Sequence, residues 1–328
     1  MPAEHRRWSW RATARLGIAI ALFVVLGARV GSAAFARGFD LLSVPLVLEA
    51  FALTALSTCC AALRWRVVAR RLDVPLPAGR AVAAYYRSQL LNSVLPGGVI
   101  GDVHRAVVHG RDVDDIGRAA RAVFWERAIG QVVQAIVTIA VLTIMPSPGR
   151  LLIPVLGAIV GGLLVATWRM CRVRRHGPGS MKHLTDVVGS DVRSLMGRPV
   201  LPVLAVTSVG IVVSHVALFV LVAHADDQAA PVHVLVPLAV IALIAAGIPL
   251  SVGGWGLREG AAAWAFAAAV GSASTGVAVS VTYGVVSLIA VTPGAALLGI
   301  DLLRRRRSEL PDQLRSESTA PRGVLSHG

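Results

Sequence analysis

Charged residues are scarce in this sequence, and lysine is almost absent. Of the 328 residues, 15% are charged and 55% are hydrophobic, and Lys182 is the single lysine. Together with a mean hydropathy of +0.69, this composition excludes an ordinary soluble globular protein and is typical of a multi-pass membrane protein. The use of arginine in place of lysine is typical of a GC-rich bacterial genome, so we expect a bacterial plasma (inner) membrane location.

Motifs for soluble catalysis are also missing. The sequence has no G-x-S-x-G, no Walker lysine motif and no H-E-x-x-H, and its longest hydrophilic loop, about residues 169–198, is too short for a catalytic domain. We therefore exclude ATP-driven pumping by this chain alone and do not expect an enzyme. No cofactor or metal is expected, because the three cysteines lack ligand spacing and His104 and His109 do not share a helix face.

The net charge of +14 comes from arginines that cluster between apolar segments and at both ends of the chain. In that position the expected partners are anionic lipid headgroups, and no nucleic acid is expected. Basic loops also face the cytoplasm in membrane proteins. The sequence thus predicts a basic cytoplasmic N-terminus at residues 1–15 and a cytoplasmic, disordered tail at residues 301–328.

Apolar segments long enough to cross a bilayer alternate with these basic stretches. The predicted full spans are approximately residues 16–30, 41–63, 122–145, 151–168, 200–223 and 275–300. The first also resembles a cleavable signal peptide, but the many later spans favour an uncleaved first helix.

Two further apolar stretches are interrupted by glycine, proline and charge. One covers about residues 81–102 and contains Pro96-Gly97-Gly98, and the other ends in the stretch 249–260. Glycine and proline weaken or break a helix, and broken backbone at membrane depth is tolerated only inside protein or around a watery cavity. Both stretches are therefore predicted to be re-entrant and to form part of a site.

The predicted fold is an all-α polytopic membrane protein with six full spans and two re-entrant broken hairpins. The order span, span, hairpin, span occurs twice, so the transmembrane domain, residues 16–300, would consist of two inverted repeats, about 16–145 and 151–300. Transporters of this architecture place their substrate near the midplane between discontinuous helices. The alternative is eight spans, in which residues 232–248 and 261–270 each cross fully.

The charged and glycine residues of the breaks are the candidate substrate-binding residues. Glycine lets the backbone approach a ligand closely, and a helix that begins after a break presents free N–H groups to it. Arg105 and Arg258 could each form bidentate hydrogen bonds to phosphate oxygens. Asp102, Glu126 and Glu259 could orient these arginines or exchange protons. The structural alternative is close helix packing and ion pairing without a ligand. The complete set is Gly97, Gly98, Gly101, Asp102, Arg105, Glu126, Arg127, Gly253, Gly254, Gly256, Arg258 and Glu259.

A charged side chain inside a membrane span has a high free-energy cost, so charged residues in the third predicted span indicate a substrate or proton pathway. The alternative is that these side chains extend to the membrane surface. Glu126 and Arg127 project about 100° apart on a helix, so they need not pair with each other, and one of them could face Asp102 or Arg105. His215 in the fifth predicted span could relay protons or be satisfied by packing.

Three motifs in this order resemble the lysylphosphatidylglycerol synthase transmembrane family of flippase-like proteins. They are the stretch 95–105 (LPGGVIGDVHR), the pair Glu126-Arg127, and the stretch 248–260 (IPLSVGGWGLREG). The resemblance implies movement of an anionic, aminoacylated or polyprenyl-linked lipid between leaflets. Some members of the family add a soluble aminoacyl transferase or glycosyltransferase domain. The resemblance gives no support for synthase activity here.

We therefore hypothesise an integral membrane protein that moves an anionic or phosphate-bearing lipid, either phospholipid or polyprenyl-linked, between leaflets. Two alternatives remain at this point. One is an intramembrane transferase acting on a lipid-linked substrate, with Asp102 or Glu126 as base. The other is a scaffold that does not transport and recruits a separately encoded lipid-modifying enzyme or envelope glycosyltransferase.

Overall fold

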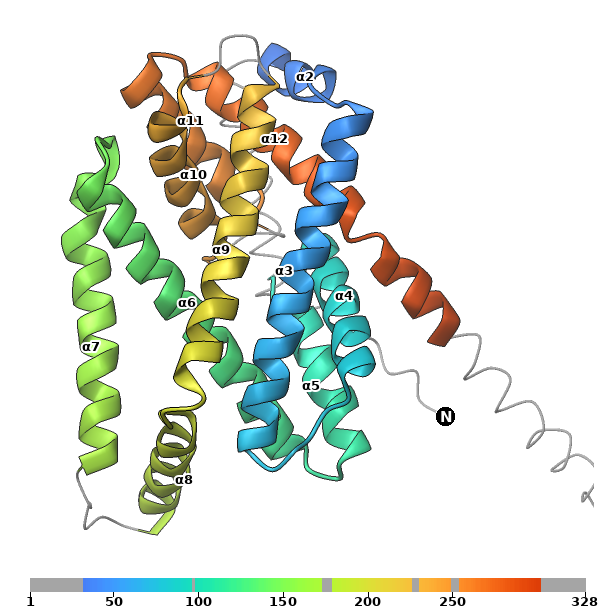
Figure 1. The fold of residues 1–328 in the computed structure, drawn as a ribbon, viewed down its shortest axis with the longest axis vertical. Helices are drawn as coiled ribbons and strands as arrows, with labels where there is room; N and C mark the ends of the chain where they lie inside the picture. Colours follow the sequence, from blue (N-terminus) through green and yellow to red (C-terminus); the bar gives the residue numbers. More distant parts are fainter. Residues whose placement is uncertain (1–31, 96–97, 173–178, 226–229, 249–253, 302–328) are drawn as a thin grey trace, which may run out of the picture.

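The computed structural model describes residues 32–95, 98–172, 179–225, 230–248 and 254–301. Every regular element in these ranges is a helix, which confirms the predicted all-α class (Figure 1). The helices are α2 (Ser32–Asp40), α3 (Val44–Arg71), α4 (Ala78–Val94), α5 (Ile100–Asp112), α6 (Ile116–Ile144), the 3₁₀ turn η1 (Pro148–Leu151), α7 (Leu152–Arg172), α8 (Gly179–Leu195), α9 (Leu201–His224), α10 (Val232–Ala246), α11 (Leu257–Val270) and α12 (Ala273–Ala290).

Five helical segments in the described ranges are long and apolar enough to cross a membrane. They are Val44–Arg71, Ile116–Ile144, Pro148–Ala166, Leu201–His224 and Ala273–Asp301. These segments coincide with five of the six predicted full spans, and the chain is a polytopic membrane protein. The predicted first span, residues 16–30, and the predicted tail from residue 302 lie outside the described residues.

Each predicted break separates two short helices that pack against each other. The pair α4 and α5 has 17 and 13 residues, and the pair α10 and α11 has 15 and 14. A helix needs about 20 residues to cross the hydrocarbon core, so none of the four reaches that length. In Figure 1 the first pair lies beside the lower half of α3, while the second lies at the opposite end of the molecule, beside the upper half of α9.

Local sequence sets the ends of the long helices. The Ser43 hydroxyl accepts a hydrogen bond from the Leu46 N–H at 3.4 Å at the start of α3, and the Asp115 carboxylate accepts one from the Arg118 N–H at 2.8 Å at the start of α6. Such caps satisfy N–H groups that have no partner within the helix. Gly271 ends α11 in the left-handed region, with φ of 79°, a conformation that glycine adopts without steric cost.

The basic segment at residues 169–198, predicted as a hydrophilic loop between two spans, is partly helical. It contains α8, whose buried residues Val192 and Leu195 face the protein. The Asp191 carboxylate accepts hydrogen bonds from Arg121 Nε at 3.0 Å and Trp125 Nε1 at 3.1 Å, both on α6. This helix is not among the described segments that are long and apolar enough to cross a membrane.

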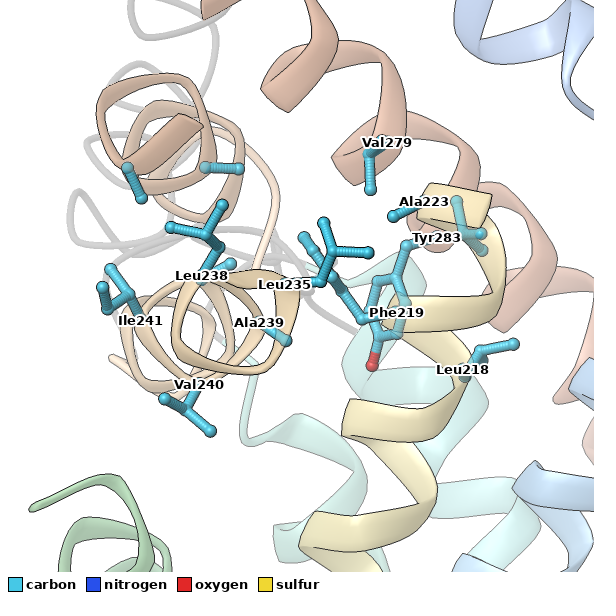
Figure 2. Close-up of a cluster of buried hydrophobic side chains, with 14 of the residues drawn as sticks. Leu218, Phe219, Ala223, Leu235, Leu238, Ala239, Val240, Ile241, Val279 and Tyr283 are labelled. Carbon is cyan, nitrogen blue, oxygen red and sulfur yellow. The ribbon is translucent and has the colours of Figure 1, made fainter. Parts of the chain in front are cut away.

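The apolar core is divided into two large clusters at opposite ends of the molecule. Figure 2 shows the cluster that joins α9, α10 and α12 through side chains such as Phe219, Leu235 and Tyr283. The second cluster surrounds Trp65 of α3 and Leu204 of α9. Between these clusters both long helices bury polar side chains, namely Thr54, Ser57, Thr58 and Arg64 on α3 and Thr207, Ser208 and Ser214 on α9.

Candidate functional site

A polar cavity of about 210 Å³ occupies this middle layer. The cavity is bounded by α3, α4, α5, α6 and α9. Its wall consists of Ser57, Ala61, Arg64, Tyr85, Ser88, Gln89, Asn92, Asp102, Arg127, Gly130, Gln131, Gln134, Ser208, Ile211, Val212 and His215. Polar groups at this depth are costly in a membrane protein, so their concentration around a cavity indicates a functional site.

Glu126 of α6 is the centre of a buried ion network beside the cavity. Its Oε1 accepts hydrogen bonds from Arg64 Nε at 2.9 Å, from Arg64 Nη2 at 2.5 Å and from the Tyr85 hydroxyl at 3.1 Å. Its Oε2 accepts one from Arg105 Nη2 at 2.6 Å. The carboxylate is completely buried, and its charge is compensated by two guanidinium groups.

Asp102, in the first turn of α5, is the second acidic centre. Its Oδ1 accepts hydrogen bonds from Ser88 at 3.2 Å and Arg105 Nε at 3.0 Å, and its Oδ2 accepts from Asn92 at 3.2 Å and Arg127 Nε at 2.7 Å. Neighbours Glu126 and Arg127 thus bind different partners, as the helical angle between them predicted. The two ends of the network meet at Arg105, which binds both acids.

This network carries more positive than negative charge. It contains three guanidinium groups, Arg64, Arg105 and Arg127, against the carboxylates of Asp102 and Glu126. Arg64 and Arg127 line the cavity, and 42% of the Arg127 side chain is exposed. The imbalance of one positive charge at a cavity wall suits an anion.

Arg105 does not lie on the cavity wall. Its side chain is fully buried, and its guanidinium lies 4.7 Å from the Trp65 ring centroid and 4.5 Å from that of Tyr85. Cation–π contacts of this kind stabilise a desolvated guanidinium. In this structure Arg105 therefore holds the network together, and Arg127 and Arg64 present charge to the cavity.

The glycines of the first break have different roles. Gly98 adopts a φ of 60°, and its carbonyl accepts a hydrogen bond from Arg127 Nη2 at 3.4 Å. A Cβ on Gly101 would lie only 2.0 Å from the Ser88 carbonyl oxygen, so Gly101 permits close packing of α4 and α5. The Gly101 N–H already donates to Asn92 Oδ1 at 2.8 Å. Gly97 lies outside the described residues.

The second break builds a separate, neutral ion pair. Arg258 Nη2 donates to Glu259 Oε1 at 2.6 Å, and the Ser280 hydroxyl donates to the same oxygen at 3.0 Å. The second Glu259 oxygen accepts from the Gly256 N–H at 2.5 Å and thereby caps α11. Both charged side chains are buried, at 4% and 0% exposure.

Backbone and aromatic groups complete the surroundings of this pair. Gly254 and Gly256 adopt positive φ values of 85° and 88°, which glycine tolerates best. The Arg258 guanidinium lies 4.9 Å from the Trp255 ring centroid and 5.2 Å from that of Tyr283. Gly253 lies outside the described residues. The structure therefore does not bring Arg258 and Glu259 into the wall of the cavity that contains Asp102.

A family model described as the lysylphosphatidylglycerol synthase TM region matches residues 13–294. This range contains both breaks, the ion network and every helix that bounds the cavity. The chain belongs to this family. Membership in the lysylphosphatidylglycerol synthase transmembrane family indicates a function related to membrane lipids. A search of curated protein sequences finds no match to this chain.

A second cavity of about 210 Å³ continues from the first inside the family domain. The two share the wall residues Gln134, Ile211, Val212 and His215. The second cavity extends to Gly247, which follows α10, and to Tyr283 of α12. Together they lead from the tip of the first hairpin toward that of the second.

Gln131 and Arg64 were not identified from the sequence as site residues, whereas His215 was named as a possible proton relay. Gln131 Nε2 donates to the Gly247 carbonyl at 3.2 Å, which ties α6 to the end of α10, and His215 Nδ1 lies 2.8 Å from the Tyr283 hydroxyl. Arg64 was counted with the basic flank of the second predicted span. The signal that could have identified Arg64 is the group of apolar residues Trp65, Val67 and Val68 after it, because α3 continues for two more turns to Arg71.

No metal centre is evident among the described residues, where no three His, Cys, Asp or Glu side chains gather. The network instead offers hydrogen-bond donors and positive charge. Each of its two carboxylates accepts four hydrogen bonds. Such an arrangement can bind an anion and exchange ion-pair partners.

Proposed function

We propose that this chain is a flippase-like protein that moves an anionic or phosphate-bearing lipid between the leaflets. The observation that carries the proposal is the polar cavity with an excess positive charge, located between helices that are apolar enough to span a membrane. A lipid crossing the bilayer needs a polar route for its headgroup while its chains stay in hydrocarbon. The cavity supplies polar contacts where lipid supplies none.

In this proposal Arg127 is the residue that first contacts the headgroup. It is the most exposed cation of the network, and its guanidinium is held by Asp102 and by the Gly98 carbonyl. A phosphate would compete with Asp102 for Arg127, while Arg64, which also lines the cavity, would add a second cation. Arg105 and Arg258, which the sequence indicated as phosphate ligands, would instead keep the two hairpins in place.

The arrangement of the hairpins supports movement between two faces. One short pair lies at each end of the molecule (Figure 1). The two cavities lead from the tip of the first pair toward that of the second. We propose two inverted repeats, about residues 16–145 and 151–300, that rock against each other around the cavities. By the positive-inside rule we propose that the C-terminal end of α3 and the basic segment that precedes α9 face the cytoplasm of a bacterial cell.

Scrambling of fluorescent phospholipid and polyprenyl-phosphate analogues in proteoliposomes tests the proposal. Arg127→Gln should slow movement of anionic analogues about tenfold or more, because a charge-assisted hydrogen bond contributes about 1.5–3 kcal/mol. The matched control is Arg111→Gln, which removes an exposed arginine at the end of α5 and should have no effect. Asp102→Asn should slow release of the phosphate headgroup from the cavity, because Arg127 would lose the carboxylate that competes with the phosphate.

Equal rates for wild type and Arg127→Gln, with both proteins folded, would contradict the assigned role. If no analogue moves in the wild type, the results would favour the scaffold hypothesis, in which the chain recruits a separately encoded lipid-modifying enzyme. The transferase reading finds less support here. A general base needs a free lone pair directed at its substrate, and both carboxylates of the network are occupied by arginine and hydroxyl or amide donors.

A further inference from the structure

A second basic pocket lies outside the ion network, where α3 ends and α9 begins. It has a volume of about 260 Å³ and does not share a wall residue with the two central cavities. Its polar wall consists of Arg66, Arg70 and Arg71. No carboxylate lines this pocket, and none of the ion pairs among the described residues involves these arginines.

The three arginines differ in how free their guanidinium groups are. Arg66 is half-buried, and its Nε donates to the Leu76 carbonyl at 3.0 Å, which fixes the loop after α3. Arg70 and Arg71 are exposed and lie in the last turn of the helix. Positive charge in the last turn complements the helix dipole, and neither guanidinium forms an ion pair with any of the described residues.

The rest of the pocket wall is apolar. Leu63 and Val67 of α3 face Val200 and Val203 at the start of α9. The apolar surface continues away from the arginines, since Leu56 is 53% exposed, Val206 71% and Val213 57%. Leu56 lies two turns before Leu63 on the same helix face, so the groove between α3 and α9 continues as apolar surface toward the middle of the spans.

We propose that this pocket binds an anionic phospholipid of the surrounding leaflet as a stationary, structural lipid. The phosphate would lie against Arg70 and Arg71, and an acyl chain would follow the apolar groove. Basic pockets between membrane helices at the cytoplasmic surface are suited to acidic headgroups. The occupant is a lipid because positive charge and an apolar groove adjoin at the end of two spanning helices, where only a lipid offers both chemistries. The proposal is independent of translocation through the central cavities.

Native mass spectrometry of the purified full chain in a neutral detergent tests this proposal. Phosphatidylglycerol should remain bound under conditions in which phosphatidylcholine with the same acyl chains dissociates. Each arginine near an anionic surface contributes about fivefold to affinity. Arg70→Gln and Arg71→Gln should therefore each weaken phosphatidylglycerol binding about fivefold. Arg111→Gln, which removes an exposed arginine from α5 instead, should leave binding unchanged.

A second variant tests the acyl-chain part of the site without a change in charge. Val203→Phe would fill the groove and should weaken phosphatidylglycerol binding while the protein stays monodisperse. Glycerol phosphate, which has the headgroup chemistry without chains, should compete poorly. Equal binding of the two lipids, an equal effect of Arg111→Gln, or full competition by glycerol phosphate would each overturn the proposal. Arg127→Gln should leave this bound lipid in place, which separates failure here from failure of the transport proposal.

Discussion

Replacement of Glu126 by glutamine gives the sharpest test of the buried network. In the structure this carboxylate accepts hydrogen bonds from Arg64, Arg105 and Tyr85 and is completely buried. Glutamine has nearly the same shape, so the change removes charge with little loss of packing. The excess of positive charge in the network would rise from one to two.

The expected cost follows from the burial of the two guanidinium groups. Leaving a buried charge without its partner typically costs about 3–5 kcal/mol. An unfolding entropy of about 2.1 cal/mol/K per residue, for 328 residues, is about 0.7 kcal/mol/K. Glu126→Gln should therefore lower the melting temperature by about 4–7 °C, measured by thermal unfolding of the purified protein in detergent.

Two controls make this prediction specific. Glu49→Gln is the same chemical change at an exposed position of α3 and should shift the unfolding free energy by less than about 0.5 kcal/mol. The double variant Arg64→Gln with Glu126→Gln restores the original charge excess, so its cost should be smaller than the sum of the two single costs. An effect of Glu126→Gln no larger than that of Glu49→Gln would refute the reasoning.

Three further predictions concern packing and the placement of helices. Gly101→Ala should force α4 away from α5 and lower the melting temperature, because the new Cβ would lie 2.0 Å from the Ser88 carbonyl oxygen. Gly79→Ala is the control and should not lower the melting temperature, because no atom lies within 4 Å of its Cβ. Gly276→Ala should destabilise the protein in the same assay, because its Cβ would lie 2.4 Å from the Ala262 carbonyl oxygen between α11 and α12. Asp191→Asn should weaken the hydrogen bonds that hold α8 to Arg121 and Trp125 of α6. Hydrogen exchange should then become faster in α8 and stay unchanged in α9.

The sequence predicted the long helices well because length and hydropathy alone decide them. Its five testable spans coincide with α3, α6, α7, α9 and α12. It did not predict α8, which contacts α6 through hydrogen bonds of Arg121 and Trp125 to Asp191. The inverted relation of the two halves remains a prediction, since the described helices show hairpins at opposite ends but the predicted first span lies outside them.

The charged residues of the site were recognised from the sequence, but their partners were not. Asp102, Arg105, Glu126 and Arg127 are notable in any reading, because charge inside an apolar segment is costly. Which arginine reaches the cavity depends on how deeply each side chain is buried. The sequence pattern does not show which arginine is buried and which is exposed. Arg64 is the clearest case, because 62 residues separate it from Glu126 in the sequence.

By itself, the sequence determined that this chain is a helical membrane protein with two broken stretches, because hydrophobic length, glycine, proline and the distribution of arginine act locally. Tertiary structure alone decided that Arg105 is enclosed between Trp65 and Tyr85 while Arg127 remains half-exposed at the cavity. The physical reason is that the desolvation and the ion pairs of a side chain depend on residues that several different helices contribute. A residue's role as structural ion or as anion ligand is fixed only when those helices pack.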